Sequence, residues 1–400
     1  MTTLYSTPRG STYDPLPVDV WPYDGAGPAY RLDGAEKVVL TWADRETSTG
    51  EFDVALTANT APLLACDGRY LLVGDLNGHR HLSVPVVAEA YNDGDGGGTR
   101  VSVTTAGPWA LLQGQRVPPV PGRPIDLQGE AEHYVLEGPV ETVVKTLLQV
   151  GVDYTGHPIV VTDDLGRGPV VRVISRFDTV AELVAEALAG TGYRLDLAAW
   201  LPGDDDAGWS LDRPSVVADV VPYRVVDGLT FSADADDLAS WRLEHTRATE
   251  DRVIVGDDEK GVAQAFTYYE RAPRPASPWA RRDGFMSLSS DEVPDAAAVV
   301  ARHLDETAAT TEAVGDVAPA GVWEYGNDGQ YGLQYSVGDF AVLDLGLAGV
   351  VDQVVTEVTA ELTPTTFTVT PTVSTPDTKK RDLYSTVVDL EQRVARQEKN

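Results

Sequence analysis

The sequence has little of what disulfide bonding, secretion or membrane insertion requires. Its 400 residues include one cysteine, Cys66, so an intramolecular disulfide bond is excluded. Cys66 lies in an apolar stretch and is expected to be a small core residue. No apolar run approaches the roughly 18 residues of a membrane-spanning helix, and the N-terminus has no secretory signal. We therefore expect a protein that is made in a cytoplasm and is not inserted in a membrane.

Basic residues are also scarce. The chain has 31 lysines and arginines against 62 aspartates and glutamates, which is a net charge of −31. Binding to nucleic acid depends on clustered lysine and arginine that neutralise phosphates. The composition therefore argues against specific nucleic acid binding and fits a very soluble protein, or a surface to which DNA must not adhere.

Recognisable catalytic and metal-binding motifs are absent. The sequence has no Gly-x-Ser-x-Gly, His-Glu-x-x-His or Gly-x-x-x-x-Gly-Lys pattern. His79 and His81 have the spacing of one strand face, but two further zinc ligands are missing, so surface or turn histidines are expected. Residues 92–97 resemble a calcium loop but lack its third acidic position and its bidentate glutamate, so a flexible hairpin tip is expected there. Residues 204–206 are expected to form a solvated acidic loop. We predict no catalytic residue, cofactor or metal ion.

The first 30 residues combine dense proline with aromatic side chains. Proline at this density disfavours helices and central strands, while the aromatic rings make the segment more adhesive than a linker. We expect an extended arm, residues 1–30, that packs on its own body or on a neighbouring subunit. Trp21 and Tyr23 are its predicted docking anchors.

The body of the chain is predicted to be α+β and rich in strands. Short β-branched or aromatic runs with glycine-rich turns fill residues 36–117 and indicate a small barrel or sandwich. Helices are expected to begin at Pro139 and, through a capping box, at Thr179. A third helix is expected at about 294–304, between further strands.

The last 20 residues have the pattern of a coiled coil. Apolar residues recur with spacings of four, three and four among polar ones: Leu383, Val387, Leu390 and Val394. A lone helix of about three heptads is marginal in water, so this stripe either folds back on the body or meets copies of itself. We favour self-association, although these heptads do not choose between a dimer and a trimer.

Several blocks in order resemble one family of viral proteins. The blocks are AEKVVLTWADRETSTGEFDVAL (35–56), VSVTTAGPWALLQGQRVPP (101–119), GPVETVVKTLLQ (138–149), GRGPVVRVISRFDTVAELVAEALAGTGYRLDL (166–197), DRVIVGDDEKGVAQAF (251–266) and YSVGDFAVLDL (335–345). Together they are similar to the tail-tip baseplate hub and minor tail proteins of long-tailed phages with non-contractile tails, the actinobacterial type in particular. The resemblance covers about residues 30–375.

The resemblance implies a fold and a domain order. Two small tube-like β-barrel domains would occupy residues 31–135 and 229–375, the second with a helical insertion around 290–330. An α+β accessory domain would span residues 136–228. The coiled-coil helix that the apolar spacing predicts would follow at residues 376–400, beyond the part that the resemblance covers. Such hubs are trimers whose six barrels adapt a six-fold tube to a three-fold tip.

The resemblance also implies a function without enzymatic turnover. The chain would be a homotrimeric virion protein at the tail tip of a siphovirus. Its partners would be distal tail and tail tube proteins, the tape-measure protein, and central-fibre or receptor-binding proteins. Two alternatives stay open: a receptor-binding module for cell-wall carbohydrate, which predicts exposed aromatics clustered on one face, and a tail-associated peptidoglycan hydrolase.

Overall fold

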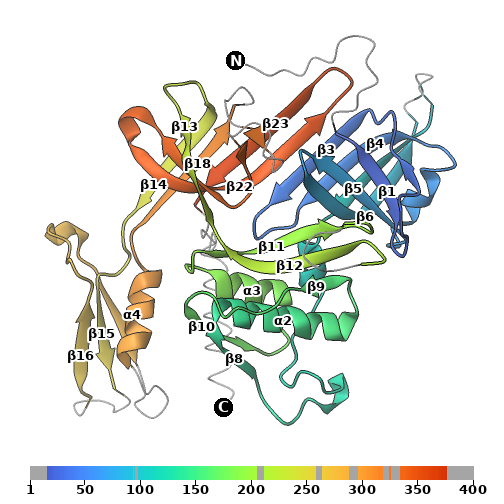
Figure 1. Cartoon of the computed structure of the whole chain (residues 1–400). Helices are drawn as coiled ribbons and strands as arrows, with labels where there is room; N and C mark the ends of the chain where they lie inside the picture. The colour runs from blue at the N-terminus through green and yellow to red at the C-terminus, as the bar shows by residue number, and fades with distance from the viewer. Residues whose placement is uncertain are drawn as a thin grey trace. The chain divides into compact units, whose positions relative to one another are not determined.

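The computed structural model describes residues 16–92, 94, 98–204, 211–257, 264–287, 296–318, 324–325 and 334–375. The chain forms two compact units (Figure 1). The larger unit contains the residues up to 241 and those from 315 onward, and the smaller unit contains residues 242–314. The predicted coiled-coil residues, Leu383, Val387, Leu390 and Val394, lie outside the described residues.

A sheet of 13 strands is the largest element of the fold. Its order is β14-β18-β23-β22-β3-β4-β7-β6-β5-β1-β2, and β21 pairs with both β22 and β13. Its N-terminal strands are β1 (Val18–Pro22), β2 (Tyr30–Arg31), β3 (Lys37–Ala43), β4 (Thr49–Ala55), β5 (Tyr70–Leu76), β6 (His79–Tyr91) and β7 (Arg100–Ala106). Its later strands are β13 (Arg224–Ser232), β14 (Leu238–Thr246), β18 (Thr310–Val317), β21 (Asp339–Asp344), β22 (Val350–Leu362) and β23 (Phe367–Ser374).

The two stretches predicted to form barrels are hydrogen-bonded to each other in this sheet. We call β1–β7 the first β segment, and β13, β14, β18 and β21–β23 the second β segment. They meet where β22 runs antiparallel to β3, from the pair Glu357 and Ala43 to the pair Leu362 and Val38. The chain is thus β-rich, as predicted, and one continuous sheet carries both β segments.

Part of the predicted N-terminal arm is a strand of the sheet. β1 lies between β5 and β2, and its pairing with β5 runs from Val18 opposite Gly74 to Pro22 opposite Tyr70. Prolines at 17 and 22 bracket this strand, and Pro22 is its last residue. The prolines therefore limit the strand to five residues without preventing it.

An α/β segment lies between the two β segments in the sequence. Its helices α2 (Val140–Thr155) and α3 (Val180–Leu188) pack against two small sheets, β10-β8 and β11-β12-β9. Their strands are β8 (Tyr134–Pro139), β9 (Ile159–Val161), β10 (Val170–Ser175), β11 (Tyr193–Trp200) and β12 (Ser215–Pro222). A short helix, α1 (Trp109–Gln113), leads into this segment.

Both helices of the α/β segment confirm their sequence signals. α2 begins directly after Pro139 and ends at Gly156, which has a left-handed φ of 66°. At the start of α3, the Thr179 side chain accepts a hydrogen bond from the Glu182 amide, and the Glu182 side chain accepts one from the Thr179 amide. The expected apolar stripe of α2, including Val144 and Leu148, is fully buried.

In the described part of the smaller unit, a helix covers one face of a short sheet. The sheet has the order β16-β15-β17, formed by β15 (Arg252–Gly256), β16 (Phe266–Glu270) and β17 (Asp283–Ser287). The helix α4 (Ala296–Glu306) overlaps the predicted third helix. Its Val300 and Leu304 pack against Val253 and Val255 of the central strand.

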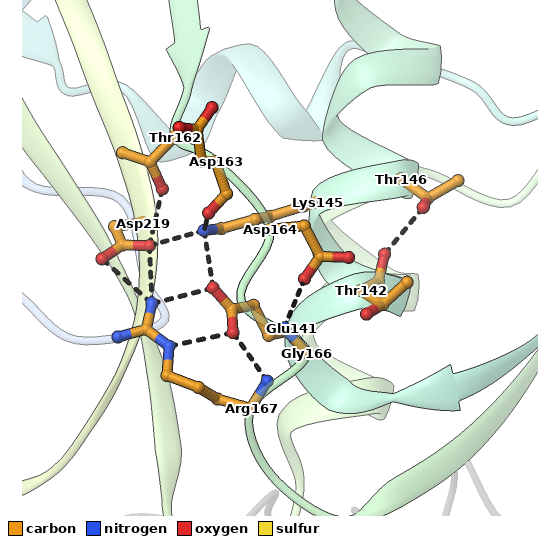
Figure 2. A network of polar contacts seen from close by, with 10 residues as sticks. All are labelled: Glu141, Thr142, Lys145, Thr146, Thr162, Asp163, Asp164, Gly166, Arg167 and Asp219. Atoms are coloured by element: carbon orange, nitrogen blue, oxygen red, sulfur yellow. Dashed lines mark hydrogen bonds and ion pairs between the residues drawn. The ribbon is translucent and has the colours of Figure 1, made fainter.

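A charge network connects the loop before β10 to the helix α2 and the strand β12 (Figure 2). Glu141 on α2 is fully buried and accepts hydrogen bonds from Lys145 Nζ at 2.7 Å and from Arg167 Nη2 at 2.8 Å. Asp219 on β12 contacts the same two cations, with Oδ1 2.8 Å from Lys145 Nζ and 2.9 Å from Arg167 Nη2. Two cations and two carboxylates therefore balance, which makes their burial tolerable.

The network also sets the acidity of Glu141. Burial alone would raise the pKa of this carboxyl, but the hydrogen bonds from Arg167 and Lys145 outweigh burial and lower it to about 2. Because the pKa in the folded chain lies below the ordinary value of 4.5, the stabilisation is present at neutral pH. It is lost as the pH falls from about 4.5 to 2.

We expect Glu141→Gln to lower the free energy of unfolding by about 3–5 kcal/mol, because Arg167 and Lys145 then share a single carboxylate. Urea denaturation at neutral pH measures this change. Glu137→Gln is the matched control, since Glu137 is exposed and 3.9 Å from Arg172, and a change under about 0.5 kcal/mol is expected there. Equal stabilities of the two variants would contradict the role given to the network.

Candidate functional site

A cavity of about 600 Å³ lies in the larger unit where three segments meet. Its walls come from the end of β3, the turn between β5 and β6, the strand β11 and the start of β21. We call it the junction cavity. Four arginines line it: Arg45, Arg80, Arg194 and Arg224.

One wall of the junction cavity is aromatic. The Tyr325 ring stacks on His79, with ring centroids 4.5 Å apart, and lies 5.2 Å from Trp42. Asn77 Nδ2 donates a hydrogen bond of 2.7 Å to the Tyr325 carbonyl oxygen. Burial raises the pKa of Tyr325 well above its ordinary value, so the hydroxyl stays neutral. These contacts attach Tyr325 to the first β segment.

Arg45 joins the first β segment to the α/β segment. Its guanidinium Nη2 donates to the carbonyl oxygens of Leu188, at 3.2 Å, and Tyr193, at 2.7 Å. The same guanidinium lies 5.6 Å from the centre of the Tyr223 ring, and the Tyr223 hydroxyl donates to Asp44 Oδ2 at 2.7 Å. A charged donor thus satisfies carbonyl oxygens at the end of α3 and the start of β11.

Two further arginines bind carboxylates in a bidentate manner. Arg80 in β6 pairs through both terminal nitrogens with Asp204, and Arg224 in β13 pairs through Nε and Nη2 with Asp339. The fork of a guanidinium matches a carboxylate, so each pair fixes an orientation as well as a distance. Charge around the cavity is largely neutralised by these contacts, and the arrangement holds segments together.

The structure corrects the expectation for His81, which is no surface or turn residue. It is 2% exposed, and the centroid of its ring lies 5.4 Å from that of Trp42. Leu82 and Ser83, the next residues of β6, are buried as well, so both faces of the strand are covered at this point. His79 is partly buried directly after the turn between β5 and β6, where it stacks on Tyr325. Among the described residues, no group of three or more His, Cys, Asp or Glu side chains could hold a metal ion.

Other predicted positions lie as follows. Trp21 is 6% exposed in the core of its own chain, whereas Tyr23 is 51% exposed and so is the anchor that a neighbour could contact. Asp204, expected in a solvated loop, is paired with Arg80, and its neighbours 205–206 lie outside the described residues. Cys66, which was expected in the core, is only partly buried; it lies at the end of a short 3-10 helix, with a φ of 47°. The docking role of Trp21 and Tyr23 stays a prediction.

Sequence reasoning missed the residues that form these contacts. Glu141 and Lys145 have the four-residue spacing of a helical ion pair, which is a visible local signal. Arg167 and Asp339 occur in the Gly-Arg-Gly and Gly-Asp patterns at 166–168 and 338–339, where glycine marks a tight backbone. Arg45 has no local signal, since its partners lie more than 140 residues away.

The sequence from residue 23 to residue 373 matches the family model of the siphovirus ReqiPepy6 Gp37-like protein. The chain belongs to this family. No protein with a curated description matches the sequence. None of the described helices has the length and apolar character needed to cross a membrane.

Solved structures of phage tail proteins share the fold. One is the 43 kDa tail protein of prophage MuSo2 from Shewanella oneidensis, with 12% identity, a TM-score of 0.51, and coverage of 90% of this chain and 98% of that chain. Another is the tail protein from Neisseria meningitidis MC58, with 12% identity, a TM-score of 0.51, and coverage of 90% and 97%. The Gp37-like chain therefore has the fold of a phage tail protein.

We expect Arg45→Ala to lower the free energy of unfolding by about 2–4 kcal/mol, because the carbonyl oxygens of Leu188 and Tyr193 lose a charged donor. Thermal and urea denaturation measure the change. Arg69→Ala removes an exposed arginine that pairs with Asp67 and should change stability by less than about 1 kcal/mol. A loss no larger than that of the Arg69 variant would show that Arg45 does not join the segments.

His81 predicts a second effect of pH. Burial lowers the pKa of His81 to about 4, so the folded chain holds it neutral while the unfolded chain protonates it near pH 6.5. Stability is therefore full above pH 6.5 and falls by about 3 kcal/mol as the pH drops from 6.5 to 4. His81→Leu should flatten this part of the pH profile, measured by urea denaturation across the range. An unchanged slope in that variant would assign the effect to other groups.

Proposed function

We propose that this chain is a homotrimeric baseplate hub that closes the distal end of a siphovirus tail tube and anchors receptor-binding or central-fibre proteins. The observation that carries the proposal is the family match over residues 23–373, together with the tail-protein fold shared across 90% of the chain. The continuous sheet supports it further, because one covalent chain holds two β segments in a fixed register.

The proposed trimer rests on the C-terminal heptads and the N-terminal segment. The seam Leu383, Val387, Leu390 and Val394 can bury its apolar stripe against two other copies. Tyr23 is exposed directly after β1, where it is available to a neighbouring subunit. The number three comes from the resemblance to tail-tip hubs, and the heptads are compatible with it.

The proposed partners follow from this position in the virion. Tail tube and distal tail proteins would contact one end of the hub, and the tape-measure protein would end there. A net charge of −31 suits the wall of a channel that DNA must pass without adhering. The proposed function is to close the tube, match its symmetry to that of the tip and anchor other proteins. It requires no cofactor, metal ion or catalytic turnover.

We expect Leu390→Asp to reduce the native mass from about three times 42.9 kDa to that of a monomer, measured by light scattering of the purified chain. Each trimer would otherwise hold three carboxylates at a desolvated contact. The described β segments should stay folded, which near-ultraviolet circular dichroism checks.

Gln392→Asp is the matched control, because residue 392 lies off the seam of the same predicted helix and its charge would stay in water. This variant should keep the mass of the unmodified chain. An unchanged mass in Leu390→Asp would contradict assembly through the C-terminal seam.

A further inference from the structure

In the described part of the smaller unit, α4 covers one face of the three-stranded sheet, and we call the opposite face, whose aromatic side chains are exposed, the open face. In the central strand, Val253 and Val255 face α4, while Arg252, Ile254 and Gly256 lie on the opposite face. The strand registers place three rows of residues on the open face: Glu270-Arg252-Asp283, Tyr268-Ile254-Phe285 and Phe266-Gly256-Ser287.

Aromatic rings dominate two of these rows. Phe266 is 59% exposed, Tyr268 is 61% exposed and Phe285 is 63% exposed, which is unusual for three large rings on one small sheet. Phe266 and Phe285 lie on opposite sides of the central strand with ring centroids 6.4 Å apart. A Cβ atom on Gly256 would lie 2.6 Å from Nε2 of Gln264 and 3.3 Å from Cε1 of Phe266, so the glycine leaves room for both side chains.

The remaining row is charged but balanced. Arg252 forms a bidentate pair with Asp283 and lies 3.8 Å from Glu270, which in turn lies 3.4 Å from Arg274. The Arg252 guanidinium also lies 5.7 Å from the centre of the Tyr268 ring. Guanidinium donors and carboxylate acceptors in fixed orientations thus border the aromatic rings. The two arginines and two carboxylates together carry no net charge.

The size of the face limits what can occupy it. Three strands about 4.8 Å apart and five residues long at about 3.3 Å each give a face of about 240 Å². A stable protein interface needs about 800 Å² from each partner, so this face alone is too small for one. Two or three sugar rings match its dimensions.

We propose that the open face of the smaller unit binds a short stretch of a neutral polysaccharide. The C–H bonds on a sugar face carry the weak positive charge that the faces of Phe266, Tyr268 and Phe285 attract. Hydroxyl groups at the edge of the sugar exchange hydrogen bonds with Arg252, Asp283 and Glu270. A polyanion is disfavoured by the net charge of −31 of the whole chain.

Affinity electrophoresis of the full chain tests this proposal. Native gels would contain dextran, mannan or arabinogalactan as neutral polymers, or hyaluronan as a polyanion. We expect at least one neutral polymer to retard the chain and hyaluronan to leave it unretarded. Phe285→Ala and Tyr268→Ala should each weaken the retardation by roughly three- to tenfold, and Phe285→Tyr should retain it, since a ring remains.

Trp241→Ala is the matched control, because Trp241 is an exposed aromatic residue of the larger unit. The polymer should retard this variant as much as it retards the unmodified chain. The proposal fails if no neutral polymer retards the unmodified chain, or if Trp241→Ala and Phe285→Ala lose retardation equally. It also fails if Phe285→Ala lowers the native mass and leaves retardation unchanged, because the face then contacts another copy. Native mass is measured separately from retardation, so the outcome is independent of the proposed hub.

Discussion

The backbone hydrogen bonds between β22 and β3 are the constraint on which the rest of the larger unit depends. They join residues about 320 positions apart and make one sheet of the two β segments. The same pairing places the end of β3 beside the second β segment, where the Asp44 amide donates to the Thr356 carbonyl oxygen. That register fixes the positions of Trp42, Asp44 and Arg45 at the end of β3. Trp42 and Arg45 form part of the wall of the junction cavity.

Charged pairs then orient the α/β segment on this frame. Arg45 and Arg80 reach it from the first β segment, and Arg224 pairs with Asp339 beside the cavity. Bidentate and carbonyl contacts are directional, so they specify one arrangement where apolar packing would allow several. A protein that sets the geometry of an assembly requires such specificity, and this is the property that the proposed hub would use.

Patterns of neighbouring residues predicted the helices α2 and α3. They could not predict the contacts that join segments far apart in the sequence. The apolar stripe of α2 and the capping box of α3 depend on residues three or four positions apart in the sequence. The sequence alone therefore identifies both. The partners of Arg45 and Arg167 depend on contacts across distant segments. The spacing of His79 and His81 places both on one face of their strand, but it does not reveal that His81 is buried against Trp42. In the smaller unit the alternation of Phe266 and Tyr268 is visible, whereas which face α4 covers is not.

The proposed hub has a defined place and copy number in the virion, and a reconstruction of the distal tail end by electron cryo-microscopy tests both. Intact virions that contain this chain would be imaged without averaging beyond three-fold symmetry. A homotrimeric hub predicts three copies around the tail axis at the tip, with the proposed seam of the C-terminal residues 381–400 on that axis. A six-fold ring of copies along the tube, or a tip without this chain, would contradict it.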